Sequence, residues 1–199
     1  MSAYKEIPPP TSILMDSFPI SVYRVLRLHK PPPARLIDLC CGPSSWTLWI
    51  EKVGGYDVCR CDVSREARLN VRADFKSSPF NDNSFDGVMA DLPYPFYHGD
   101  RYGGLKTFSE YLSLLEQVGH TGLRLLRSDG VLLLKTADFW NKGEMYSGVW
   151  AVYSVLKENF VCKDLAVTVL KPFVFSPGQF QKCLRTHNYL MVFRPRAPP

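Results

Sequence analysis

Short runs of apolar residues recur along the chain from residue 35 onward, and stretches with helical spacing separate several of them. Runs of about four to eight apolar residues bounded by turn-forming residues are typical of buried strands. The pattern predicts seven strands, at 35–40, 56–61, 70–73, 85–90, 130–136, 162–170 and 187–194. It predicts helices at 44–53, 107–127 and 145–159.

The order of these elements indicates the fold class. Near-continuous apolar strands that alternate with helices are typical of a parallel sheet covered by helices on both faces. The last two predicted strands have no helix between them, so we expect them to pair as an antiparallel hairpin. We therefore expect an α/β protein with a mostly parallel seven-stranded sheet and an antiparallel last strand. Ligands in such sheets bind at the carboxyl ends of the strands.

The first 33 residues differ from the rest of the chain. Two proline clusters, Pro8 to Pro10 and Pro31 to Pro33, bracket a segment whose apolar residues suit a short helix. Proline triplets favour extended polyproline backbone and act as stiff joints. We expect an N-terminal arm over residues 1–33 and one domain over residues 34–199.

The composition narrows the class of protein. A chain of 199 residues with 46% hydrophobic content can bury one core. No apolar run approaches the roughly 20 residues of a membrane span, and the N-terminal segment resembles no signal peptide. We expect an intracellular, cytoplasmic protein without a membrane partner. The net charge of +5 is compatible with a polyanionic partner.

The cysteines do not predict a metal site. Cys59 and Cys61 would share one face of a strand, so a metal pair is conceivable. However, the sequence contains no Cys-x-x-Cys and has no histidine near this pair. We expect reduced cysteines that fill the core, and no metal.

The loop after the first predicted strand carries a candidate cofactor site. Asp38 lies within the strand, where a carboxylate is costly unless something pairs with it, and the amino group of a ligand would do so. Cys40 leads into Gly42, and a glycine there allows a tight turn and the close approach of a ligand. The loop lacks G-x-G-x-x-G spacing, which disfavours a dinucleotide or phosphate cradle.

Two further acids follow the next predicted strands. Asp62 can accept hydrogen bonds from both hydroxyls of a ribose. Asp74 and the adjacent Phe75 can hold an adenine by its amino group and its ring face. Each acid alone is more often a cap or turn residue. Their joint placement at one edge of the sheet favours ligand binding.

The strand at 85–90 ends in the tetrapeptide Asp91-Leu92-Pro93-Tyr94. The Asp91 carboxylate and a nearby backbone carbonyl can hold an amino group by its two hydrogens. The Tyr94 ring can stack on a flat heterocycle. This combination suits methylation of an exocyclic amine on a base.

Together these residues resemble the class I S-adenosylmethionine-dependent methyltransferases, and among them the amino-methyltransferases with an Asp/Asn-Pro-Pro-aromatic motif. Residues 36–42 are similar to the first cofactor motif, residues 91–94 to the catalytic motif, and residues 187–194 to the last strand of many DNA amino-methyltransferases. Leu92 stands where that family usually has proline.

The resemblance implies a Rossmann-like class I methyltransferase fold with S-adenosyl-L-methionine as cofactor. Asp62 and Asp74 would be the acids that contact ribose and adenine. Asp91 and the Leu92 carbonyl would orient the target amine, Pro93 would belong to the same motif, and Tyr94 would stack on the base.

Residues on the substrate side are aromatic or basic. Candidates for substrate binding are Phe96, Tyr97, Arg101, Lys135, Lys182 and Arg185. Aromatic rings with lysine and arginine suit base stacking plus phosphate contact. The last two lie in the segment 171–186, which is equally well explained as a hairpin loop with packed aromatics.

The leading hypothesis is an enzyme that methylates an exocyclic amine of a nucleic-acid base, which is adenine or cytosine in DNA, or a base in RNA. A protein glutamine N-methyltransferase is an alternative, since it uses a similar motif. The chain could also be a non-catalytic subunit that has the cofactor fold and binds a larger partner. A separate recognition subunit would suit the enzyme, because the chain has no room for a large recognition domain.

Overall fold

The computed structural model describes residues 11–43, 46–64, 67, 69–96, 104–169 and 187–197. Within these residues eight strands form the main sheet, in the order β1-β9-β10-β6-β5-β2-β3-β4. The strands are β1 (Ile13–Leu14), β2 (Arg35–Asp38), β3 (Asp57–Asp62), β4 (Val71–Arg72), β5 (Phe85–Asp91), β6 (Leu126–Thr136), β9 (Phe160–Val169) and β10 (His187–Pro195).

The pairing of the strands confirms a mostly parallel sheet. β2 runs parallel to β3 and to β5, and β6 runs parallel to β5. β10 is antiparallel to both β6 and β9, as expected for the last strand. The expected number of seven is wrong by one, because β1 from the N-terminal arm adds to the edge beside β9, with Ile13 opposite Val167.

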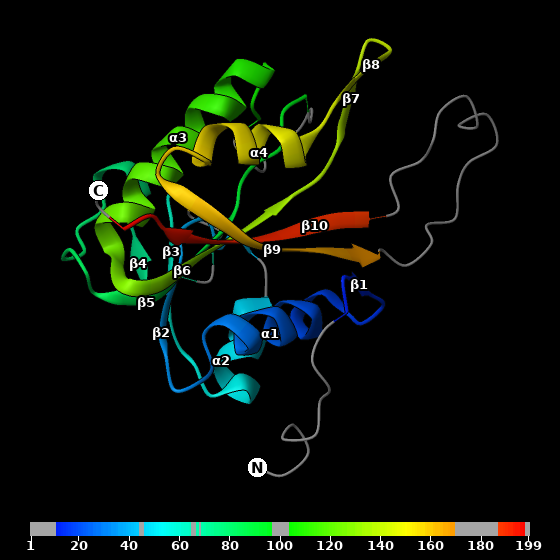
Figure 1. Cartoon of the computed structure of the whole chain (residues 1–199). Helices are drawn as coiled ribbons and strands as arrows, with labels where there is room; N and C mark the ends of the chain where they lie inside the picture. The colour runs from blue at the N-terminus through cyan, green and yellow to red at the C-terminus, as the bar shows by residue number, and fades with distance from the viewer. Residues whose placement is uncertain are drawn as a thin grey trace.

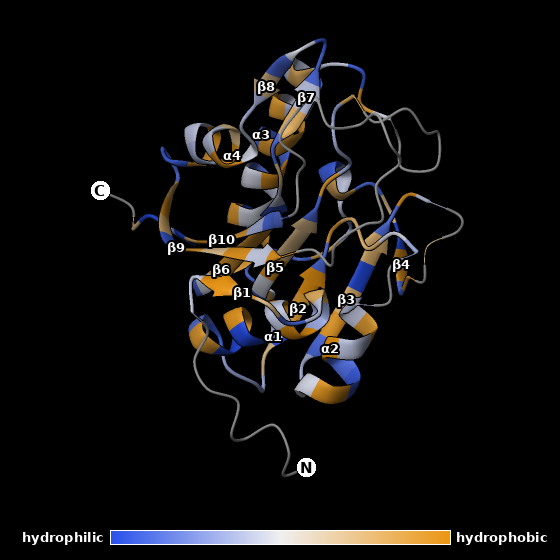
Figure 2. Cartoon of the chain, turned by 90° about the vertical axis from the view of Figure 1, so that its right-hand side faces the viewer, coloured by the Kyte–Doolittle hydropathy of each residue, from blue (hydrophilic) through white to orange (hydrophobic). Residues whose placement is uncertain are grey.

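Helices cover both faces of the sheet (Figure 1). They are α1 (Phe18–His29), α2 (Trp46–Gly54), the 3-10 helix η1 (Phe75–Ser77), α3 (Phe108–Leu125) and α4 (Gly148–Leu156). α1 and α2 lie on one face and α3 and α4 on the other. Figure 2 shows that the ribbons of α1 and α2 alternate between hydrophobic and hydrophilic residues, as amphipathic helices do.

Each face therefore has its own core. Val22, Leu26 and Ile50 of α1 and α2 are fully buried against Leu36 and Leu133 of the sheet. On the opposite face α3 and α4 bury a second set of side chains. That set includes Tyr111, Leu115, Val118 and Val152. None of the helices in the described ranges is long and apolar enough to cross a membrane.

The described part of the N-terminal arm is packed against the domain. The predicted short helix is present as α1. At its end Lys30 Nζ lies 2.6 Å from Asp129 and 3.6 Å from Asp86, and its carbonyl accepts a hydrogen bond from Tyr56 at 2.9 Å. With β1 paired to β9, the segment is held at both ends.

Along the chain, between β6 and α4, the protein forms a two-stranded hairpin that the apolar pattern did not predict. It consists of β7 (Phe139–Asn141) and β8 (Glu144–Tyr146), and it projects away from the main sheet (Figure 1). The helix expected from residue 145 therefore begins later, at Gly148, after Ser147 caps its first turn by accepting from the Trp150 amide.

Candidate active site at the carboxyl edge of the sheet

Acidic side chains from three adjacent strands meet at one edge of the sheet. Asp38, Asp62 and Asp91 are the last residues of β2, β3 and β5. These strands are parallel neighbours, so their carboxyl ends coincide. The charges of Asp91 and Asp62 both raise the pKa of Asp38. Three of the four acids expected at this edge thus lie at the ends of adjacent parallel strands, and their roles in ligand binding stay predictions.

Asp38 is the most unusual of the three. Its side chain is fully buried. Oδ1 accepts a hydrogen bond from the Cys40 amide at 3.3 Å, whereas Oδ2 has no hydrogen-bond partner among the described residues. Burial, aided by the two neighbouring carboxylates, raises the pKa of Asp38 to about 8. The nearby Thr47 hydroxyl lowers the pKa of Asp38, against the effect of burial. The hydroxyl does not, however, reach the geometry of a hydrogen bond to Asp38. Asp38 Oδ2 is thus a buried oxygen that lacks a hydrogen-bond partner among the described residues.

The glycine loop beside Asp38 is held by Asp62. Gly42 has a φ of 52°, in the left-handed region that favours glycine. Its amide donates to Asp62 Oδ2 at 2.8 Å, and the Ser64 amide donates to Oδ1 at 2.8 Å. The carboxylate therefore ties the loop after β2 to the loop after β3. Its remaining lone pairs are compatible with the predicted ribose contact, which stays a prediction.

The cysteines near this loop are poor nucleophiles. Burial raises the pKa of the Cys40 thiol well above its ordinary value, and the charge of Asp38 adds to the effect. Burial likewise raises the pKa of Cys41 to about 12 and that of Cys61 to about 11. At neutral pH these thiols stay protonated, and only a thiolate is an effective nucleophile.

Asp74 and Phe75 have structural roles in the described residues. Asp74 caps η1 by accepting from the Lys76 amide at 3.0 Å. The Phe75 ring is buried in the core beneath α3, and the Phe75 carbonyl accepts a hydrogen bond from Thr121 at 3.3 Å. A contact of this pair with adenine stays a prediction.

Asp91 is paired, in contrast to Asp38. Lys135, at the carboxyl end of β6, donates to Asp91 Oδ2 at 2.6 Å. No other residue in the described ranges hydrogen-bonds to Asp91, so Oδ1 is available to a ligand. The Lys135 ammonium also lies over two rings, 5.0 Å from the centroid of Phe18 and 5.3 Å from that of Tyr94. Lys135 was expected to bind substrate, and the structure places it against the proposed catalytic acid.

The other three residues of the tetrapeptide follow the end of β5 and differ in burial. The Leu92 side chain is 2% exposed and belongs to the core on the α3 face, which gives a packing reason for leucine at this position. Pro93 and Tyr94 are half-buried. Phe96 has a φ of 63°, a strained value for a phenylalanine, and its amide is bonded to the Leu105 carbonyl at 2.9 Å.

A chain of aromatic rings supports this segment. Tyr94 packs on Phe139, and Phe96 packs on Tyr146, with centroids 5.3 and 5.2 Å apart. Phe108 and Tyr111 of α3 bridge between these two pairs, because Tyr111 contacts Phe139 and Phe108 contacts Tyr146. The hairpin β7–β8 and the start of α3 thus hold both ends of residues 94–96 in place.

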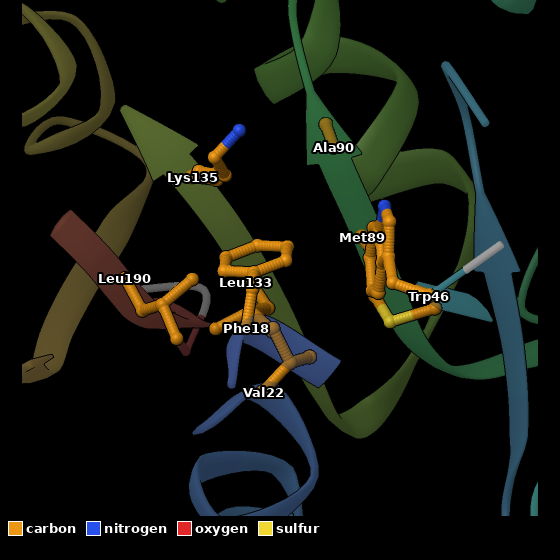
Figure 3. Close-up of a pocket in the computed structure, with 8 residues that line it drawn as sticks. All are labelled: Phe18, Val22, Trp46, Met89, Ala90, Leu133, Lys135 and Leu190. Atoms are coloured by element: carbon orange, nitrogen blue, oxygen red, sulfur yellow. The ribbon is translucent and has the colours of Figure 1, made fainter. Parts of the chain in front are cut away.

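A small cavity of about 10 Å³ lies beside Lys135 on the α1 face, with room for about one water molecule. Its lining residues are Phe18, Val22, Trp46, Met89, Ala90, Leu133, Lys135 and Leu190 (Figure 3). The sequence reasoning did not assign Phe18 and Trp46 to the site. No motif could have found them, because they reach this edge only through the docking of α1 and the start of α2.

The remaining candidates cannot be placed. Tyr97, Arg101, Lys182 and Arg185, with the segment 171–186, lie outside the described residues. No group of three or more histidine, cysteine, aspartate or glutamate side chains in the described part of the chain could hold a metal ion.

No protein-family model and no curated protein matches this sequence. Solved structures do resemble it. A TehB-like SAM-dependent methyltransferase from Corynebacterium glutamicum has a TM-score of 0.51 and 18% identity, over 87% of this chain and 86% of the other. The 1,6-didemethyltoxoflavin-N1-methyltransferase of Burkholderia thailandensis, crystallised with 1,6-didemethyltoxoflavin and S-adenosylhomocysteine, has a TM-score of 0.56 and 18% identity, over 88% and 76% of the two chains.

A [4+2]-cyclase, SpnF, is similar as well, with a TM-score of 0.58 and 15% identity, over 89% of this chain and 81% of the other. These likenesses confirm the expected Rossmann-like class I methyltransferase fold. They do not fix the reaction, since one of these proteins is named as a cyclase.

Proposed function

We propose that this protein is an S-adenosylmethionine-dependent N-methyltransferase that acts on an exocyclic amine of a nucleic-acid base. The observation that carries the proposal is the meeting of Asp38 and Asp91 at one sheet edge, one with a buried unpaired oxygen and the other with an oxygen left for a ligand. The first suits the amino group of the cofactor, and the second suits the amine to be methylated.

The residues after β2 and β3 fit this cofactor. A ligand amino group would satisfy Asp38 Oδ2, which is otherwise an orphaned buried acceptor. The turn at Gly42 allows close approach, and Asp62 fixes that turn while it keeps lone pairs for ribose hydroxyls. Bound S-adenosylmethionine supplies an electrophilic methyl group on its sulfonium.

Asp91 then acts on the target amine. Oδ1 accepts a hydrogen bond from the amine, which aligns the nitrogen and raises its electron density. The Leu92 carbonyl is the second acceptor that we assign to the same amine. Lys135 keeps the carboxylate in place through Oδ2. After transfer the nitrogen loses a proton, and Asp91 is the nearest group assigned to accept it.

The substrate class rests on the aromatic and basic surroundings of Asp91. Tyr94 and Phe96 follow the acid in sequence, and both residues are only half-buried. A flat heterocycle can stack on such rings, while a protein glutamine side chain gains less from them. The net charge of +5 favours a polyanion. An N-methyltransferase crystallised with a ring compound has the same fold.

Tritiated S-adenosylmethionine incubated with separate pools of DNA, RNA and protein tests the proposal. We expect label in DNA or RNA and its loss in Asp91→Ala. Label in the protein pool alone would instead support a glutamine N-methyltransferase. Binding of nucleic acid without cofactor binding or transfer would support a non-catalytic subunit and overturn the proposal.

A further inference from the structure

The N-terminal helix α1 lies at the proposed active site although it is separate from the strands that carry the catalytic motif. Phe18 is its first residue, and the ring lies 5.0 Å from the Lys135 ammonium and 5.5 Å from Trp46 in an edge-to-face arrangement. Figure 3 shows the Phe18 ring in front of Leu133, with Lys135 at the end of its strand. A residue of the arm thus contacts a residue that contacts Asp91.

Few contacts fix the position of the Lys135 ammonium group. Its side chain is long and flexible, and its ammonium has three donors. Among the described residues it forms one hydrogen bond, to Asp91 Oδ2, and two ring contacts, to Phe18 and Tyr94. A cation over the face of an aromatic ring is attracted by the ring's quadrupole. The two rings therefore restrict the ammonium to the position from which it reaches Asp91.

Contacts on both sides of α1 hold the helix, and with it Phe18, in place. β1 pairs with β9 just before α1, and Lys30 joins Asp129 and Asp86 just after it. Val22, one turn after Phe18, is fully buried in the same cavity wall. α1 is therefore held firmly enough to position a side chain at the site.

We propose that α1 completes the active site, with Phe18 as a positioning residue that holds the Lys135 ammonium on Oδ2 of Asp91 and so leaves Oδ1 for the target amine. This inference rests on the proposed function for its consequence in catalysis. The geometry of the Phe18–Lys135–Asp91 contact can be tested without it.

The first test is spectroscopic and needs no substrate. In protein labelled with ¹³C-lysine, the methylene protons next to the Lys135 ammonium lie near two ring faces, so we expect them upfield of the other lysines. Lys135→Met identifies the signal by its loss. Phe18→Leu should move the signal toward the ordinary lysine position. Val25→Ala changes a buried residue of α1 that does not line the cavity, and it should leave the signal in place. An ordinary Lys135 position in the wild-type protein would overturn the inference.

The second test is methyl transfer from tritiated S-adenosylmethionine to the nucleic-acid pool that accepts label. Phe18→Leu should lower kcat by roughly tenfold to a hundredfold, because a small misplacement of a catalytic group has that effect. The KM for the cofactor should change little, and Phe18→Tyr should restore the rate. Val25→Ala, which removes a buried side chain from the same helix but not from the cavity beside Lys135, is the matched control.

The outcomes separate the two proposals. An equal fall in kcat for Phe18→Leu and Val25→Ala, or no fall for Phe18→Leu, would mean that Phe18 only packs α1, and the inference would be wrong. A wild-type protein that transfers no methyl group would overturn the proposed function, while the lysine spectrum would still decide whether Phe18 holds Lys135.

Discussion

Asp38 and Asp91 end neighbouring parallel strands, yet their surroundings are opposite. Asp38 is fully buried, with one oxygen unpaired and its pKa raised to about 8. Asp91 is half-buried and bound to the Lys135 ammonium at 2.6 Å. Burial favours the neutral form of Asp38, whereas Asp91 forms an ion pair with Lys135.

The difference indicates a division of roles. A nearby positive charge favours the ionised form of a buried acid, so an ammonium group such as that of the cofactor would draw the proton off Asp38 and pair with its unsatisfied oxygen. A carboxylate that already has a cation on one oxygen is suited to orient a neutral amine with the other. We therefore expect Asp38 to act on cofactor binding and Asp91 on methyl transfer. Substitutions of the two acids can be tested separately.

The largest expected effect comes from Asp91→Ala. Without the acceptor the target amine is neither aligned nor relieved of its proton, so methyl transfer should fall by about a hundredfold or more. Affinity for S-adenosylhomocysteine, measured by calorimetry, should change little. Asp82→Ala is the matched control, because Asp82 also forms a short pair, 2.9 Å from Arg124, but lies before the amino end of β5. Asp91→Ala with a wild-type rate would contradict the assignment.

Asp38→Asn is expected to act on cofactor affinity instead. Asparagine keeps the shape but cannot form a charged pair with the ligand amino group, so the Kd for S-adenosylhomocysteine should rise by roughly tenfold to a hundredfold. Asp57→Asn, an exposed acid at the amino end of the adjacent strand, should leave the Kd unchanged. If both variants bind like the wild type, Asp38 does not hold the cofactor.

Leu92→Pro gives the Asp-Pro-Pro-aromatic motif that the sequence resembles, and it tests what the leucine contributes. The Leu92 side chain is buried in the core, so we expect the free energy of unfolding to fall by about 2 kcal/mol or more through lost burial. We expect no gain in methyl transfer. Denaturant unfolding measures the first effect, and Leu92→Met, which keeps the volume, should lose less than about 1.5 kcal/mol. A proline variant that is both more stable and more active would show that the leucine is a defect.

A separate expected effect is a dependence of stability on pH. The folded protein keeps a proton on Asp38 until pH approaches about 8, whereas in the unfolded chain the same group has its ordinary pKa of 3.8. The resulting stabilisation is complete below pH 3.8 and is lost as pH rises through about 8, by up to about 1.4 kcal/mol per pH unit. The melting temperature of the wild type should therefore fall relative to that of Asp38→Asn between pH 5 and pH 8. Parallel curves for the two proteins would contradict a buried neutral Asp38.

The sequence predicted most of the sheet but not the contacts made by short or distant elements. All seven expected strands are present. Six of them have at least four residues, and the seventh, β4, has only two. β1 has only two residues and β7 and β8 have three each, so none shows a periodicity. The position of α1 against Lys135 depends on tertiary packing, and no spacing in the sequence encodes it.

The site was predictable where strand ends determine it. Asp38, Asp62 and Asp91 follow apolar runs, and parallel strands bring such residues to one edge. The pairing of Lys135 with Asp91 was foreseeable in part, since both residues end neighbouring strands. The burial of Phe75 and Leu92 in the core was not, because a motif gives the order of residues and not the direction of their side chains.

The most direct test of the central claim is a crystal structure of the protein with S-adenosylhomocysteine. We expect the amino group of the ligand against Asp38 Oδ2 and its sulfur directed toward Asp91. A ligand bound elsewhere, or an Asp38 that remains unpaired beside the bound ligand, would contradict the account.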